Sequence, residues 1–219
     1  MRILLGMMVS ALALAGCSYS SHGPEDNRSV ERAGMVASGD VDATGSAEYA
    51  GMVVSASGNI GRDLDLQGAT VSSNAHVGGN LSAQGARVRF TGRVDGNTDV
   101  QAATAYLDGR FGGEVSIQGA RLTINGEIDG PLFAQGAHVR LAGRFAEPVD
   151  VMGEGSRSAG RAIIAGTLEQ GGRVCAGEVE IRRGARANGP LTIIADERPE
   201  GRDISFTFED RAGRDCDRL

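Results

Sequence analysis

The sequence predicts an all-β fold, a single-stranded parallel β-helix (solenoid) with three short strands in each turn of about 17 residues. The first observation is the glycine content, 34 of 219 residues beside only 5 prolines, which excludes collagen and indicates glycine at fixed structural places. The second is a Gln-Gly-Ala motif, once Gln-Ala-Ala, that recurs every 17 residues. The third is the spacing of apolar residues by two, which is the period of a strand. The motif begins at Gln67, Gln84, Gln101, Gln118 and Gln135.

Five rows align on this period without an insertion, and the regular repeat extends over residues 47–148. Counted from the first residue of each row, positions one, three, eight, ten and fourteen are mostly apolar, and we expect them to face the interior. One turn buries too little apolar surface to offset the entropy cost of ordering its backbone, so turns are stable only when stacked. The rows are Leu64–Asn80, Leu81–Asn97, Thr98–Glu114, Val115–Pro131 and Leu132–Pro148.

The corners between the predicted strands carry the repeated glycines. Gly85 and Gly119 belong to one corner column, and Gly92 and Gly109 belong to another. Glycine at such a corner permits positive φ and lets successive turns approach closely. The glutamine that opens each motif has two interpretations, an amide ladder along the stack or a corner residue that faces solvent.

The N-terminus has the layout of a bacterial lipoprotein signal peptide, predicted over residues 1–16. Leu14-Ala15-Gly16-Cys17 resembles the lipoprotein cleavage signal, which implies acylation of Cys17, with palmitate among the acyl chains; a plain secretory peptide is the alternative. Ser18 resembles the outer-membrane sorting signal. Residues 17–29 are then the lipidated cysteine and a flexible polar tether. We expect a location in the bacterial cell envelope, lipid-anchored at the outer membrane and facing the periplasm.

The β-helix domain is predicted over residues 30–194, with a degenerate first copy beginning near Val30 and looser turns after Val149. In these later turns one insertion and one shortened turn are expected. Residues 195–219 are predicted to form a C-terminal cap strand and a charged tail. The alternation of Ile204, Phe206 and Phe208 indicates the strand, which would cover the last turn and its open edge.

Two cysteines remain once Cys17 is acylated, and they are Cys175 and Cys216. In an oxidising compartment they either form one disulfide that holds the tail to the last turns or remain free thiols.

The sequence indicates a protein that is not an enzyme and that uses no cofactor. Without residues 1–16 the chain has 21 basic and 28 acidic residues, a charge near −7 that argues against a nucleic-acid partner. The histidines, His22, His76 and His138, fall in different places of the repeat, so no metal site is expected. A remote alternative, a carbohydrate-active β-helix enzyme, rests on carboxylates repeated along a face, although a solvated surface explains them better. These are Asp65, Asp99 and Asp150 in one column and Asp95 and Asp129 in another.

Arginine supplies every basic charge, because the chain contains no lysine. On an unbroken 17-residue period, position thirteen holds a stripe that could contact an anionic polymer or lipid headgroup, interrupted by Glu127. The alternative is that acidic residues on the same surface balance it. The predicted stripe is Arg93, Arg110, Arg144 and Arg161, and a neighbouring face carries Arg87, Arg89, Arg121 and Arg140.

The glycine-alanine corners with apolar pairs, as in VEIRRGARANGPL from Val179 to Leu191, resemble the bactofilin, or polymer-forming cytoskeletal, family. The resemblance covers roughly residues 47–194 and implies a right-handed, three-sided β-helix that polymerises end to end without nucleotide. It also implies a scaffold role for cell shape and envelope enzymes. The chain departs from this family in its lipoprotein signal, since bactofilins typically act in the cytoplasm. A weaker resemblance, carried by Ala37–Val41 and Ala56–Ile60, is to the β-helical head domains of adhesin-like lipoproteins.

We therefore expect a non-enzymatic envelope lipoprotein that acts as a scaffold, with self-association as in bactofilins. The alternative is an adhesin-like module that binds an envelope glycan or a protein through its flat faces.

Overall fold

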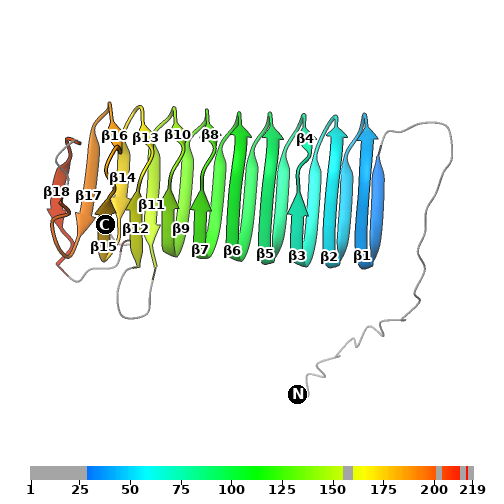
Figure 1. The fold of residues 1–219 in the computed structure, drawn as a ribbon, viewed down its shortest axis with the longest axis horizontal. Coiled ribbons are helices and arrows are strands. Elements are labelled where there is room, and N and C mark those ends of the chain that lie inside the picture. Colours follow the sequence, from blue (N-terminus) through cyan, green and yellow to red (C-terminus); the bar gives the residue numbers. More distant parts are fainter. Residues whose placement is uncertain (1–28, 155–159, 201–203, 213–215, 217–219) are drawn as a thin grey trace, which may run out of the picture.

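The protein forms a rod of about ten stacked turns, with every described strand paired in parallel in one continuous sheet (Figure 1). This computed structural model describes residues 29–154, 160–200, 204–212 and 216. Residues 1–16, Cys17 and His22, and therefore the predicted signal, lipidation site and most of the tether, lie outside the described residues. Within the described part no helix is long and apolar enough to span a membrane. The predicted fold class, an all-β parallel solenoid, is confirmed.

Some turns contain one long strand that continues around a corner, and others are divided into two or three short strands. The strands are β1 Val30–Ala43, β2 Ala47–Ile60, β3 Leu64–Ser73, β4 His76–Val77, β5 Leu81–Val94, β6 Thr98–Phe111, β7 Val115–Ile124, β8 Glu127–Ile128, β9 Leu132–Leu141, β10 Arg144–Phe145, β11 Val149–Gly153, β12 Arg161–Ile164, β13 Thr167–Leu168, β14 Gly172–Cys175, β15 Glu178–Ile181, β16 Arg186–Ala187, β17 Leu191–Ala195 and β18 Thr207–Asp210.

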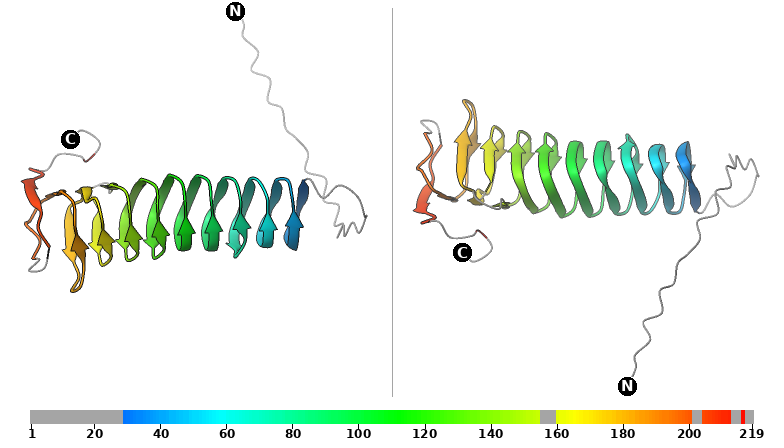
Figure 2. Two further views of the ribbon diagram at one scale, coloured as in Figure 1. Left: turned by 90° about the horizontal axis from the view of Figure 1, so that it is seen from above. Right: turned by 90° about the horizontal axis from the view of Figure 1, so that it is seen from below.

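The register repeats the 17-residue period of the sequence. Leu64 pairs with Leu81, Leu81 with Thr98, and the ladder continues without slippage to Val149. The first copy also follows this period, because β1 pairs with β2 from Val30↔Ala47 to Ala43↔Ile60. Figure 2 shows the resulting straight rod from two sides, with β1 at one end and β18 at the other.

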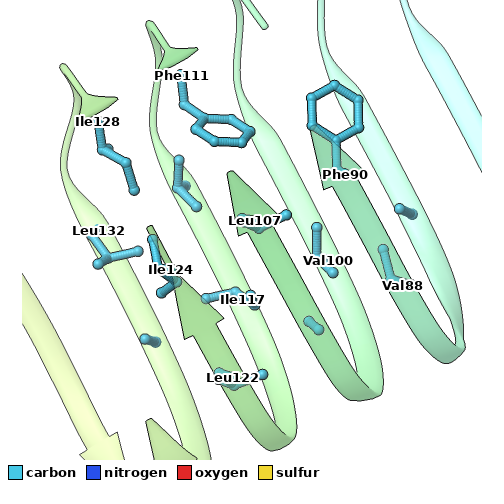
Figure 3. Packing of buried hydrophobic residues seen from close by; sticks show 14 of the residues in the cluster. Val88, Phe90, Val100, Leu107, Phe111, Ile117, Leu122, Ile124, Ile128 and Leu132 are labelled. Carbon is cyan, nitrogen blue, oxygen red and sulfur yellow. The ribbon is translucent and has the colours of Figure 1, made fainter. Parts of the chain in front are cut away.

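The interior is mainly apolar, and most of its residues are those at positions one, three, eight, ten and fourteen, although Ser73 and Thr98 place hydroxyl groups at two of these positions. In β5 these are the residues with the lowest exposure, while the residues between them face outward. Phe90 and Phe111, from successive turns, pack with ring centroids 5.8 Å apart (Figure 3). Burial of each such side chain contributes roughly 1.5–3 kcal/mol. The buried residues of β5 are Leu81, Ala83, Val88, Phe90 and Val94.

Close approach of successive turns explains the glycine of the Gln-Gly-Ala corner. A Cβ added at Gly85 would lie 2.2 Å from the carbonyl oxygen of Gly68 in the turn before. Positive φ occurs instead at the second corner, where Gly109 has φ 151° and Gly58 has φ 102°. Ala102 takes the glycine place in one turn, and the ladder between β6 and β7 lacks the pair at this place, which the ladder between β3 and β5 has as Gly68↔Gly85.

A polar ladder follows the third corner, and its members are asparagine and aspartate rather than glutamine. Asn80 donates from its backbone N–H to Asp63 Oδ1 at 2.8 Å, and its own Oδ1 accepts the backbone N–H of Asn97 at 2.9 Å. The Oδ1 of Asn97 in turn accepts the backbone N–H of Glu114 at 3.0 Å. Among the described residues the corner glutamines that form side-chain hydrogen bonds donate to carboxylates, as Gln67 does to Asp65 at 3.3 Å. The glutamine ladder is therefore not the arrangement of this stack.

Later turns differ from the 17-residue period by two insertions before Leu191, where one insertion and one shortened turn were expected. A shorter step follows β17, since Thr192 pairs with Thr207, 15 positions on. Val149 pairs with Gly172, 23 positions on, because the corner after Gly153 is longer. The following turn is two residues longer than the repeat, since Gly172 pairs with Leu191. The predicted position of Arg161 is consequently wrong: Arg161 lies beside His138, and Thr167 takes the place next to Arg144. The six inserted residues move Arg161 from position thirteen, the place of Arg144, to position seven, the place of His138.

The C-terminal end is covered by β18, as the alternation of Ile204, Phe206 and Phe208 predicted. This strand starts only at Thr207 and extends the parallel ladder, with Ile193 paired to Phe208. Cys175 and Cys216 form a disulfide, with their Cα atoms 5.7 Å apart, which selects the bridged alternative. Arg211 adds an ion pair with Asp196 at 2.9 Å. The last turn is thus tied down by a strand, a disulfide and a charged contact.

Arg32 closes the other end of the rod. It pairs with Tyr49 at position three, an inward-facing place that later turns fill with apolar residues. Its guanidinium lies 5.9 Å from the centroid of the Tyr49 ring, and its Nη1 donates to the carbonyl oxygen of Ser38 at 2.5 Å. A Cβ on Gly39 would lie 2.3 Å from that nitrogen, so glycine leaves room for the guanidinium.

Candidate functional site

The predicted arginine stripe is an ion-paired column. Arg93 Nε lies 2.6 Å from Asp95 Oδ1, and Arg110 Nη2 lies 2.5 Å from Glu127 Oε2. Arg144 Nε lies 3.0 Å from Glu169 Oε1. Exposed pairs of this kind contribute only about 0–1 kcal/mol to stability, but they neutralise the column as a surface for anions.

Two carboxylates that pair with this column have pKa values lowered by their partners. Hydrogen bonding from Arg93 holds the pKa of Asp95 below its ordinary value, with His76 adding to the effect. Hydrogen bonds from Asn188 and then Arg144 likewise lower the pKa of Glu169. Both carboxylates are therefore ionised at neutral pH and satisfy the arginines beside them.

A second group of arginines carries positive charge that the described residues do not balance. Arg87, Arg89, Arg121 and Arg140 project outward from β5, β7 and β9, and all four are exposed. None of the four forms a salt bridge within the part of the chain that the structure describes. We call these four residues the arginine face.

The register explains why this face lacks acidic partners. Arg87 pairs with Thr70 on one side and Thr104 on the other. Arg121 lies between Thr104 and His138, and Arg140 pairs with Thr123. Positions seven and nine of the middle turns thus hold threonine, histidine and tyrosine in place of carboxylates. Successive turns are about 4.8 Å apart, so the charges are spaced along the rod axis at intervals of one or two turns.

Tyr106 contributes an aromatic surface to the arginine face. The Arg89 guanidinium lies 4.8 Å from the Tyr106 ring centroid, and the tyrosine hydroxyl donates to Asp108 Oδ2 at 3.1 Å. A half-buried ring beside exposed cations can contact the apolar face of a sugar ring while arginines bind its anionic groups.

Beyond this face the next arginine is neutralised again. Arg161 Nη2 lies 3.2 Å from Glu178 Oε1 and 2.8 Å from Glu180 Oε2. The arginine face is therefore confined to the middle of the rod, over residues 87–140, and ends where the first long corner begins.

The carboxylates of the two predicted columns lie turns apart and do not converge. Asp65 and Asp99 share position two but are separated by the turn that holds Ser82, and Asp150 lies three turns beyond Asp99. Asp65 and Asp99 each accept a hydrogen bond from the glutamine two residues on. Asp95 is bound to Arg93 and His76, while Asp129 lies two turns further along the same column. Asp150 Oδ1 lies 3.4 Å from Arg173 Nε, so Asp65, Asp95, Asp99 and Asp150 belong to separate local contacts.

The described histidines do not converge. His76 Nε2 lies 3.4 Å from Asp95 Oδ2, whereas His138 belongs to the second side of the rod beside Arg121. Among the described residues no group of three His, Cys, Asp or Glu side chains is arranged to hold a metal ion.

The 17-residue period itself contains the signal that separates the two sets of arginines. Arg93 has an acid two residues on, and Arg110 has Glu127 one turn on. The residues one turn before and after Arg87 are both threonine. Comparing each arginine with its neighbours at one period would have identified the arginine face as the unbalanced one.

Comparisons with protein-family models, curated proteins and solved structures find no match for this chain. The fold nevertheless defines a class, the parallel β-solenoids, in which short coils present flat, periodic outer faces.

Proposed function

We propose that this protein is a non-enzymatic scaffold of the bacterial cell envelope, anchored at the outer membrane through acylated Cys17. The observation that supports it best is the unbroken register from Val30 to Val149, which makes a straight rod with side chains at fixed spacing. At about 4.8 Å per turn, ten turns reach about 50 Å. Such a rod holds bound partners at a set distance from its anchor.

The structure of the two ends of the rod opposes end-to-end association of copies of the chain. Arg32 crosses the first turn, and β18 with its disulfide covers the last. An inward-pointing charge and a covered edge both oppose strand pairing between molecules. We therefore expect discrete rods rather than the long filaments that a bactofilin-like scaffold would form.

Electron microscopy of the full chain, purified in detergent, tests this proposal. Single rods of uniform length are expected, with acylation of Cys17 verified by mass spectrometry. Filaments that lengthen with protein concentration would instead support end-to-end assembly. Release of oligosaccharides from purified envelope glycans would contradict the non-enzymatic role and support the carbohydrate-active alternative.

The arginine face favours a second function, binding of an anionic envelope polysaccharide, which is the adhesin-like alternative. Four exposed arginines without acidic partners, together with Tyr106, suit carboxylate or phosphate groups repeated along a polymer. The chain is acidic as a whole, so binding depends on this local segregation of charge and weakens as salt screens it.

A matched pair of double variants tests this binding with alginate, a uronic-acid polysaccharide, as the probe. Arg87→Gln with Arg121→Gln should weaken binding by about 30-fold, because two contacts with anionic groups are lost and each contributes about 1 kcal/mol near the surface. Arg93→Gln with Arg110→Gln removes the same charge from the ion-paired column, and its effect should be below about twofold. Equal losses in the two variants would show that only net charge matters, and neutral dextran should not bind.

A further inference from the structure

An exposed apolar corner lies at the N-terminal end of the rod. Met35 and Val36 in β1, and Met52 and Val53 in β2, are 69%, 67%, 60% and 45% exposed. Val36 pairs directly with Val53, so the four side chains form two stacked layers at one corner. We call these four residues the apolar corner.

The apolar corner is confined to the first two turns. One turn further along, the same positions hold Ala69 and Thr70, and beyond them Ala86 and Arg87. Within the corner, Gly34 and Gly51 precede the methionines, so no polar side chain interrupts the apolar surface on that side. Isolated exposed apolar residues are common on proteins, but a contiguous exposed group marks a surface that binds another apolar phase.

The position of the corner identifies its partner. Cys17, the lipid attachment site of the proposed function, precedes Val30 by 13 residues. Even a fully extended chain of this length spans only about 45 Å, and a relaxed one about 20 Å. The first two turns are therefore the part of the rod held nearest to the membrane, and a surface already held there needs only weak intrinsic affinity to bind.

We propose that the apolar corner inserts into the lipid surface to which Cys17 is anchored, and that it thereby orients the rod. This proposal rests on the membrane anchoring in the proposed function. Methionine suits such a surface because its unbranched, flexible side chain adapts to irregular surroundings. Insertion is shallow, since the apolar residues lie at a corner and the acidic residues Glu31 and Glu48 belong to the adjoining face.

The absence of tryptophan from the chain permits a clean test. Met52→Trp introduces a single emitter at position six of the second turn, and Ala103→Trp introduces one at the same position three turns further along. Each acylated full-length variant is reconstituted in vesicles of phosphatidylethanolamine and phosphatidylglycerol, with and without brominated lipid. We expect a blue-shifted emission and quenching by brominated lipid for Met52→Trp, and neither for Ala103→Trp.

Further variants make each outcome decisive. Met35→Asp in the Met52→Trp background should abolish the quenching by brominated lipid while circular dichroism verifies the fold. Equal quenching of both tryptophans by aqueous acrylamide, with none by brominated lipid, overturns the proposal. A blue shift without vesicles that disappears on dilution also overturns it, because the corner would then bind a second copy of the chain. Mass spectrometry of Cys17 separates a failed anchor, which concerns the proposed function, from a failed insertion.

Discussion

At the N-terminal end, the contact between Arg32 and Tyr49 leaves the buried tyrosine hydroxyl without a hydrogen bond. Tyr49 is fully buried in the second turn, and its hydroxyl has no hydrogen-bond partner among the described residues. Arg32 lies over the ring without reaching that hydroxyl. A buried hydroxyl without a partner costs about 1–3 kcal/mol. The ring of Tyr49 therefore stabilises the fold by its burial, while its hydroxyl destabilises the fold.

We predict that Tyr49→Phe stabilises the protein by about 1 kcal/mol in urea unfolding, because it removes the unpaired hydroxyl and retains the ring. Burial raises the pKa of Tyr49, an effect that Arg32 partly opposes. Above pH of about 10 the unfolded chain loses this proton while the folded chain retains it, so stability falls as pH rises. The advantage of Tyr49→Phe should therefore grow on the alkaline side.

Tyr106→Phe is the matched control, since the Tyr106 hydroxyl already donates to Asp108. It should be neutral or slightly destabilising. If both variants stabilise the protein equally, the unpaired hydroxyl of Tyr49 is not the cause.

At the scale of one turn, the corners are held by backbone proximity and by the Asp63, Asn80 and Asn97 ladder. The side chain of Asn80 both donates to Asp63 Oδ1 at 3.0 Å and accepts the backbone N–H of Asn97. We predict that Asn80→Ala destabilises the protein by about 0.5–1.5 kcal/mol, because two bonds that join three successive turns are lost.

Gln84→Ala provides the comparison within the same turn. Gln84 is an exposed corner residue, and replacing it should change stability by less than about 0.5 kcal/mol. Thermal unfolding followed by circular dichroism measures both variants. The reverse order would mean that the glutamine column, rather than the asparagine column, stabilises the corners.

The turn is also the scale at which the limits of sequence reasoning are clearest. The apolar positions and corner glycines could be predicted because burial and close approach constrain residue type strongly at one place in each turn. For the repeated glutamine the sequence left two interpretations open, and it did not indicate the asparagine ladder, since the sequence does not show which amide reaches the next turn. Arg161 was misplaced because an insertion in a corner changes the register without disturbing the apolar pattern around it.

Across the whole molecule, the surfaces are arranged by turn and by side. The apolar corner belongs to the first two turns, the arginine face to the middle turns, and the covered end to the last. Along the rod axis the arginine face begins two turns, about 10 Å, beyond the apolar corner. The apolar and the charged surfaces are therefore separated along the rod.

A rod built from equivalent turns should accept another turn. We predict that an in-frame duplication of Leu81–Asn97 folds, because the native row already packs on its neighbours in the same register on both sides. Small-angle scattering should show a rod longer by about 4.8 Å, with thermal stability equal to or above that of the parent chain. The added turn also carries second copies of Arg87 and Arg89, so alginate binding should strengthen. A duplication of Leu81–Gly92 is the control, since its 12 residues break the period and should disrupt the stack. If both insertions unfold the rod, its turns are not equivalent, and the stack is then held together by interactions specific to each turn.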